Sequence, residues 1–569
     1  MQRYASIDFL RGLAIFLMLF LHMVGNLLFV DTILADAANV PLINIVILII
    51  FSFTGGLAGL FLMISSIGNM ISMNKHLKRG KSVRDLVIKQ VIGGILLLIF
   101  AMLVEGIIGA YGGLGSFFRT MNNPGNTPFI RILYRWNWFE TIHTIAWCVI
   151  INGIVQGILS RNGGWQNTRK LVICYAILTV VVLCATQIVW NSVAYLVPGY
   201  PFAIDPGTGI PIYMPVLGQS APLYILASPF LAALAAPMEP LFPYLAVSFI
   251  GSIIGIVISQ ARDKIPRNFP KRMIKVGFVM FIVGLIGIIF VLFNVFTTQG
   301  FAKAAYLFEN ISRHRHWAPD NPRAIIPPFA WVWQFLCLIG FTIMAIMIII
   351  RLVEFRGKGK EFAEKTTFIR RFGFVAFTNY TIQWIYYIMF FMMSLLFLGV
   401  PYERMNWGLT LLTTTVSLLI YYLIMWAWEK KRYIGSIEWC IGTIAFNLIP
   451  IKRESLEPKK KWWEKGALNV EGAFYNVEWL NIVEKEEIKH DKLEESKLAY
   501  KLSLVALFTI IFMPASFITY FLAKKAQKTE KINKYNKIAV IASITGMVLV
   551  VIFFVICSIL TLNMLGISL

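Results

Sequence analysis

Residues 3–30 read RYASIDFLRGLAIFLMLFLHMVGNLLFV, and this segment indicates the fold class. Within 7–30 the only ionisable side chains are Asp8, Arg11 and His22. An apolar stretch of about 18 residues or more with so few charges is typical of a transmembrane helix. The stretch is too long for the apolar region of a cleavable signal peptide and lacks a small-residue cleavage site. We therefore expect a transmembrane helix here.

The same apolar character continues along the chain. Of its 569 residues, 58% are hydrophobic and only 14% are charged, whereas soluble domains carry about 25% charged residues. A water-soluble fold could not cover that much apolar surface, so we predict an all-α, polytopic integral membrane bundle. Its ten core helices are predicted at residues 7–30, 42–72, 86–110, 138–160, 170–190, 240–260, 274–296, 327–350, 372–398 and 407–428.

The loop charges predict how this bundle is oriented. The chain has a formal net charge of +23. Four alternate loops, at 73–90, 161–170, 261–275 and 351–371, together carry 22 Lys and Arg residues, whereas the five loops between them carry 8. Lys and Arg accumulate in cytoplasmic loops. The protein is therefore expected in the plasma membrane with its N-terminus in the cytoplasm. The positive charge is explained by topology and by attraction to anionic lipid rather than by binding of nucleic acid.

The chain changes character after the tenth predicted helix. Residues 1–450 are predicted to form the membrane core. Residues 451–499 have mixed charge and are predicted to be a soluble linker, and 500–569 to be a C-terminal transmembrane hairpin with spans near 500–523 and 537–562. Because this topology puts the basic turn 524–537 on the wrong side, another segment such as 221–236 or 440–451 is expected to cross or re-enter the membrane.

Ionisable side chains inside membrane spans are costly, so they are candidates for function. The predicted topology places two histidines and several carboxylates near the outer face. A neutral imidazole can accept a proton near pH 7, and a carboxylate beside it can orient it, which suits acyl transfer. The catalytic candidates are His22, His143, Glu105 and Glu239.

The inner face carries a contrasting set of side chains. Fixed positive charge suits phosphate groups, and amide and hydroxyl groups could bind an adenine or a pantetheine chain. The candidates for binding a donor are Asp8, Arg11, Arg370, Arg371, Asn379, Tyr380 and Gln383. Asp8 and Arg11 are three residues apart and therefore share a helix face, and Gly12 would let another backbone approach closely.

Each of these candidates also has a purely structural interpretation. Asp8 and Arg11 could be an ion pair that locks helices, and a histidine within a span could be a packed core residue. Carboxylates near the water boundary cost little, and most basic loops only determine topology. No metal is expected, because the six cysteines and the histidines lack metal-ligand spacing.

The first predicted helix resembles a known family. Arg3–Met18 followed by His22 is similar to the opening of the heparan-α-glucosaminide N-acetyltransferase catalytic-domain family and its prokaryotic relatives. Residues 141–146, reading TIHTIA, and 238–241, reading MEPL, resemble further segments of that family. Residues 377–383 (FTNYTIQ) and 435–439 (GSIEW) resemble motifs of a related bacterial membrane family.

The resemblance implies a membrane acyltransferase for residues 1–450. Acetyl or another acyl group would move from cytoplasmic acyl-CoA to a sugar or glycan on the far side, as part of cell-envelope glycan modification. In the lysosomal enzyme a histidine of the first outer loop is the catalytic candidate. Here that loop, 31–41, contains Asp31 and Asp36 but no histidine, so His22 is the candidate in its place.

Two other functions fit the same residues. A transporter or flippase of a lipid-linked or small polar substrate also needs polar residues within spans, arranged around a midplane site that opens alternately to each side. A non-catalytic scaffold would use the part after residue 453 to bind a partner. A homodimer is compatible with the sequence under each of these functions.

Overall fold

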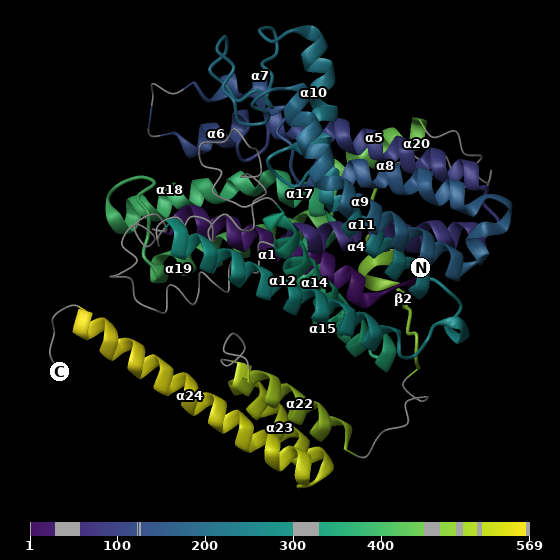
Figure 1. Ribbon diagram of the computed structural model, residues 1–569, viewed down its shortest axis with the longest axis vertical. Coiled ribbons are helices and arrows are strands. Elements are labelled where there is room, and N and C mark those ends of the chain that lie inside the picture. The colour runs from purple at the N-terminus through teal and green to yellow at the C-terminus, as the bar shows by residue number, and fades with distance from the viewer. Residues whose placement is uncertain are drawn as a thin grey trace. The chain divides into compact units, whose positions relative to one another are not determined.

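The computed structural model describes residues 2–28, 57–121, 123, 127–299, 329–448, 467–484, 493–508 and 515–564. These residues are mostly helical (Figure 1). The long helices are α1 (Ala5–Leu27), α4 (Leu57–Lys78), α5 (Val83–Ile107), α8 (Thr141–Ser160), α9 (Thr168–Leu196), α11 (Leu241–Ile258), α12 (Phe269–Gln299), α14 (Ala330–Val353), α19 (Trp407–Glu429) and α24 (Lys534–Met564).

Shorter elements connect these helices. The short helices are α6 (Gly113–Arg119), α7 (Ile132–Arg135), α10 (Pro222–Ala235), α15 (Gly359–Lys365), α16 (Thr367–Phe374), α17 (Ala376–Thr381), α18 (Ile385–Leu398), α20 (Ile437–Leu448), α22 (Glu494–Phe508) and α23 (Ser516–Glu530). Two-residue strands β1 (Gln2–Arg3) and β2 (Glu478–Trp479) pair in parallel. Single 3₁₀ turns lie at Pro128–Arg131, Arg161–Gln166, Arg262–Lys264, Glu354–Arg356 and Ile382–Trp384, and a π turn at Glu471–Tyr475.

Within the described ranges, nine helical segments are long and apolar enough to cross a membrane. They are Ala5–Leu27, Val83–Ile107, Thr141–Gln166, Thr168–Leu196, Leu241–Ile258, Phe269–Gln299, Ala330–Arg356, Ala376–Leu398 and Trp407–Glu429. Each coincides with one of the ten predicted spans. The remaining span, 42–72, lies partly outside the described residues, and its second half forms α4. These lengths and compositions are those of a helical integral membrane protein.

Two apolar helices are too short to cross a bilayer unaided. α10 has 14 residues and α20 has 12, whereas a span needs about 20. They occupy the segments that were expected to cross or re-enter. The predicted span 372–398 is itself discontinuous, because α17 ends at Thr381 and the 3₁₀ turn Ile382–Trp384 separates it from α18.

The chain divides into two compact units. The first contains the described residues up to Val483, so 467–483, within the segment predicted as a linker, packs with the core. The second contains α22, α23 and α24, which pack through small side chains such as Ala499, Ala523 and Ala539. The predicted span 500–523 is divided here between α22 and α23, and its residues 509–514 lie outside the described ranges.

A close helix crossing positions α1 within the first unit. A Cβ atom on Gly12 would lie 2.0 Å from the carbonyl oxygen of Ile369, and one on Gly373 would lie 2.4 Å from the backbone nitrogen of Gly12. The two glycines therefore allow α1 and α16 to touch backbone to backbone, as expected of Gly12. This contact determines where the polar residues of α1 lie.

A buried carboxylate anchors the start of α1. Glu354 is fully buried, and its Oε1 accepts the backbone N–H of Ser6 at 2.9 Å. The N-terminal N–H groups of a helix have no partner within the helix, so a carboxylate placed there satisfies one of them and favours the positive end of the helix dipole. Tyr4 adds a second tether by donating its hydroxyl to the carbonyl of Ile258 at 2.7 Å.

We predict that Gly12→Ala lowers stability by about 1–3 kcal/mol, because the added methyl group forces two packed backbones apart. Gly25→Ala is the matched control on the same helix, since a Cβ atom there meets nothing within 4 Å. Thermal unfolding of both variants in detergent measures the difference. Equal midpoints for the two variants would show that the crossing is not tightly packed.

Candidate functional site

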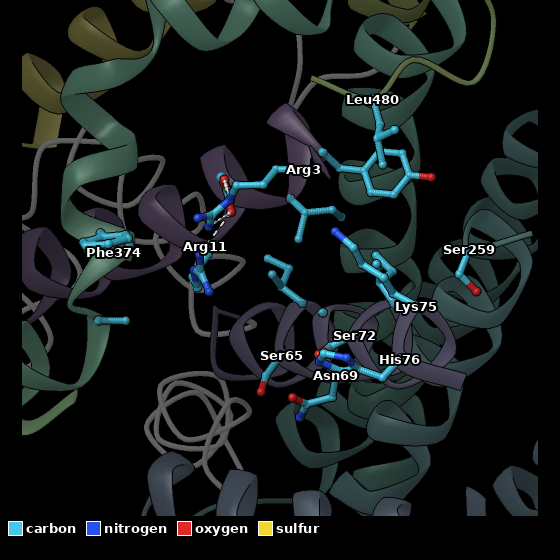
Figure 2. Close-up of a pocket in the computed structure, with 18 of the residues that line it drawn as sticks. Arg3, Arg11, Ser65, Asn69, Ser72, Lys75, His76, Ser259, Phe374 and Leu480 are labelled. Carbon is cyan, nitrogen blue, oxygen red and sulfur yellow. Dashed lines mark hydrogen bonds and ion pairs between the residues drawn. The ribbon is translucent and has the colours of Figure 1, made fainter. Parts of the chain in front are cut away.

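A cavity of about 880 Å³ lies at the end of the first unit that carries the N-terminus (Figure 2). Its walls come from the first turns of α1, one side of α4, the end of α11, the start of α17 and residues 480–481. A volume of this size is typical of sites that bind small molecules and cofactors.

Basic side chains dominate this cavity. Its lining includes Arg3, Arg11, Lys75, Lys78, Arg79 and Arg262, and two carboxylates, Asp8 and Glu438. Asp8 contacts Arg3 at 2.7 Å and Arg11 at 3.1 Å. Glu438 accepts the backbone N–H of Phe377 at 2.7 Å. Because both carboxylates are engaged and the cations outnumber them, the cavity should attract anions.

The pKa of His76 is affected by the positive charges around this cavity. It lies in the last turn of α4, and its Nδ1 atom is buried without a hydrogen-bond partner. Burial, together with the charges of Lys89, Lys81, Arg79 and Lys75, lowers the pKa of His76 to about 4. This imidazole is therefore neutral at pH 7, and an anion bound beside it would favour its protonated form.

The cavity is long and its two ends differ. Along α4 it is lined from Phe61 to Arg79, which corresponds to about 27 Å of helix. Lys75, Lys78, Arg79 and Arg262 lie toward one end, whereas Phe61, Ile64 and Ile145 make the other end apolar. Arg11 lies between them, on the side of Ser65 and Phe374 (Figure 2). This shape suits a ligand with an anionic head and a slender, less polar arm.

Of the seven residues predicted to bind a donor, Asp8 and Arg11 line this cavity. Arg11 donates through Nη2 to Asp8, while its Nε atom is buried without a partner. Arg11 can therefore offer a further donor to a bound anion, and Asp8 holds its guanidinium in place.

The structure uses Arg370 and Arg371 differently. Neither is among the residues that line the cavity. Arg370 donates to the carbonyl oxygens of Ala363 and Ala473, and Arg371 forms an ion pair with Glu429 at 2.7 Å. Both guanidinium groups hold segments of the protein together, which the run of basic residues in 351–371 could not reveal.

Asn379, Tyr380 and Gln383 also lie outside the cavity lining. Asn379 donates to the carbonyl of Phe372 at 2.9 Å, which bridges the irregular junction between α16 and α17. Tyr380 packs in an apolar cluster with Ile142. Gln383 lies in the 3₁₀ turn between α17 and α18 and meets one of the predicted catalytic residues.

That residue is His22, which is half-buried on α1. Its Nδ1 atom lies 2.5 Å from Oε1 of Gln383. An amide oxygen can only accept a hydrogen bond, so in this orientation of the amide the neutral imidazole carries its proton on Nδ1. The Nε2 atom then keeps its lone pair, which is the arrangement that a general base needs.

His143 is held in the opposite tautomer. Its Nδ1 atom accepts the backbone N–H of Glu140 at 3.3 Å as part of the N-terminal cap of α8. The neutral ring therefore carries its proton on Nε2. This Nε2 atom is buried and has no hydrogen-bond partner. His143 is thus suited to donate a hydrogen bond rather than to accept a proton.

The predicted carboxylates cluster around the start of α8. Glu105 is buried at the end of α5, close enough to Glu140 and Arg135 to interact electrostatically with both. Glu239 accepts a hydrogen bond from the hydroxyl of Thr141. Burial raises the pKa of Glu239 to about 7, which the Thr141 hydroxyl opposes and the charge of Glu140 reinforces. These groups form a second polar region, at the end of the bundle opposite the basic cavity.

The helices that carry the two histidines meet beside this second region. Met18 of α1 packs against a cluster that contains Ile142 of α8. Met18 is one helical turn before His22, and Ile142 precedes His143. The cavity lining on α1 ends at Arg11, eleven residues before His22, or about 16 Å along the helix.

The sequence interpretation missed several residues of the cavity. Lys75, His76, Arg79 and Arg262 belong to loops and helix ends that were assigned to topology alone. Glu438 belongs to the GSIEW segment, and nothing in its spacing indicated that it would line the same cavity as Arg11. No group of three or more His, Cys, Asp or Glu side chains in the described part of the chain could hold a metal ion.

Comparison with known proteins does not identify a family. No family model matches the chain, and no curated protein matches it significantly.

We predict that Glu239→Gln flattens the dependence of stability on pH. The pKa of this carboxyl is about 7 in the folded protein and 4.5 as the ordinary value, so its protonated form is favoured by folding. The resulting stabilisation is complete below pH 4.5 and is lost as the pH rises through 7. Gln mimics the neutral carboxyl at every pH.

Thermal midpoints in detergent between pH 4.5 and 8 test this prediction. The midpoint of the unsubstituted protein should fall further over this range than that of Glu239→Gln. Parallel curves would contradict a raised pKa at Glu239.

Proposed function

We propose that this protein is a membrane-bound acyltransferase that takes an acyl group from acyl-CoA on the cytoplasmic side and transfers it to a sugar or glycan on the opposite side. The observation that carries the proposal is the long cavity with a basic end and an apolar end. The resemblance of the first helix to an acetyltransferase family supports the same function.

The chemistry of coenzyme A suits this cavity. Its nucleotide end carries several phosphate charges, and its pantetheine arm is long, slender and less polar. The phosphates would bind among Arg3, Arg11 and Arg79, where charge-assisted hydrogen bonds are strong. The arm would then extend toward Phe61 and Ile145, into the membrane interior. If the arm continued past the level of Met18, it would bring the thioester toward His22.

The two imidazole tautomers suggest how transfer would proceed. His22 Nε2 would accept the proton of an acceptor hydroxyl or amine as the acceptor atom attacks the thioester carbonyl carbon. His143 Nε2–H would donate to the oxyanion that forms. The carbon–sulfur bond then breaks, and the proton held by His22 passes to the departing thiolate. Glu239, with a pKa near 7, is suited to exchange protons with the acceptor, and Glu105 lies close to Glu140 and Arg135.

A transporter or flippase is the second candidate, and the break between α17 and α18 favours it. Discontinuous helices near the middle of a bundle are typical of transporter sites. Gln383 lies at this break and contacts His22. A transporter of this kind would not need coenzyme A, so binding of coenzyme A distinguishes the two functions.

We predict that coenzyme A raises the thermal midpoint of the purified protein, because a ligand that binds only the folded state stabilises it. Arg11→Gln and Arg79→Gln should each weaken binding by about tenfold, the effect of losing one charge-assisted hydrogen bond. Lys271→Gln is the control, since Lys271 is an exposed cation outside the cavity lining. No stabilisation by coenzyme A at millimolar concentration would contradict the proposed donor and favour transport.

We further predict that His22→Gln lowers transfer from labelled acetyl-CoA to glycan acceptors by about 10²-fold or more, because it removes the general base. His143→Gln should cost less, since the Gln amide can still donate a hydrogen bond. The binding of coenzyme A should persist in both variants, because neither residue lines the cavity. Full transfer by both variants would show that the assigned base is wrong.

A further inference from the structure

We infer that residues 467–483, which follow the membrane core in sequence, form one wall of the donor site, and that their docking is coupled to anion binding. The identity of the donor as acyl-CoA rests on the proposed function. The part played by the segment rests on the contacts described next.

The segment contributes directly to the cavity. Leu480 and Asn481 line it together with α1 and α4, and Figure 2 shows Leu480 at its edge. These two residues lie more than 30 positions after the last residue of α20. The cavity is therefore completed by a part of the chain outside the predicted ten-helix core.

One set of contacts ties the segment to the basic residues of α1. β2 pairs with β1 in parallel, with Trp479 opposite Arg3, and the N–H of Leu480 donates to the carbonyl of Arg3 at 2.9 Å. The Arg3 side chain in turn contacts Asp8 at 2.7 Å, and Asp8 holds Arg11. Docking of the segment thus helps to place the cations that would bind the donor.

A second set ties the segment to the residues that follow α14. The N–H groups of Ile482 and Val483 donate to the carbonyl of Glu354, and Asn481 accepts the N–H of Gly359 at 3.1 Å. The Arg370 guanidinium stacks over the Trp479 ring, with 4.4 Å between its central carbon and the ring centroid. Arg370 would therefore support the donor site by holding Trp479 in place, and not by contacting phosphate.

The contacts that hold the docked segment bear on how its docking is coupled to anion binding. A strand pair of two residues is marginal by itself, and each hydrogen bond contributes only about 1 kcal/mol net. Buried apolar side chains of the segment, such as Val470, Ile482 and Val483, add to these hydrogen bonds. Because docking helps to place Arg3 and completes the cavity wall, the docked form should bind an anion more tightly, and the anion then favours docking by the same factor.

Hydrogen–deuterium exchange of the full-length protein tests the inference, with coenzyme A and inorganic pyrophosphate as separate probes. We expect coenzyme A to slow exchange in both 75–79 and 478–483. Protection of 75–79 alone would overturn the inference while leaving the donor site intact. If pyrophosphate protects both segments and coenzyme A protects neither, the inference stands and the acyl-CoA function fails. Protection by neither probe would overturn both.

Three full-length variants give a second test through the affinity for coenzyme A. Leu480→Asp places a carboxylate in the cavity wall and should weaken binding by about tenfold or more through repulsion of phosphate. Leu480→Asn has a similar size without the charge and should bind more tightly than Leu480→Asp. Asn476→Asp adds the same charge at an exposed position of the segment, outside the lining, and should leave binding unchanged. Equal affinity in all three would contradict a wall at Leu480.

Discussion

The Asp8 carboxylate, held between Arg3 and Arg11 near the start of α1, is the interaction on which the rest of the site depends. Each charge placed inside a membrane protein is costly unless it is paired, and here one anion is shared by two cations. The pairing keeps both guanidinium groups in the cavity and leaves a net positive charge there. The close crossing at Gly12 and Gly373 and the anchoring of Ser6 by Glu354 hold α1 in the position that this arrangement requires.

The bundle has two polar regions with different chemistry. The end with the basic loops collects cations around a long cavity, and the opposite end collects carboxylates around α8. His22 and His143 lie on helices that pack together beside the carboxylates. Their ring nitrogens are held in opposite tautomers by Gln383 and by the backbone of Glu140. Under the proposed function, these rings would supply a base and a hydrogen-bond donor whose orientation is set by the fold before any substrate is bound.

Hydropathy predicted the coarse fold well, because nine apolar stretches correspond to nine helices, among the described residues, that are long enough to span a membrane. The close approach at Gly12 was also predicted, since only a small residue fits a backbone contact. The basic cavity was not predicted. Lys75, Arg79 and Arg262 come from loops far apart in the sequence, and their convergence depends on helix packing that no local pattern encodes. The docking of 467–483 was missed for a similar reason, because a mixed-charge segment carries no periodicity that points to the core.

The same limit applied to individual side chains. Arg370, Arg371 and Asn379 were chosen for their chemistry, yet the structure engages each of them with backbone carbonyls or a carboxylate. In contrast, His76 and Glu438 were not chosen and line the cavity.

A map of the protein with bound coenzyme A, determined by electron cryomicroscopy, would test the central claim most directly. The account predicts phosphate density among Arg3, Arg11 and Arg79, with the pantetheine arm running along α4 toward Phe61 and the thiol pointing to the level of His22. An empty basic cavity, or coenzyme A bound elsewhere with its thiol directed away from α1, would contradict it.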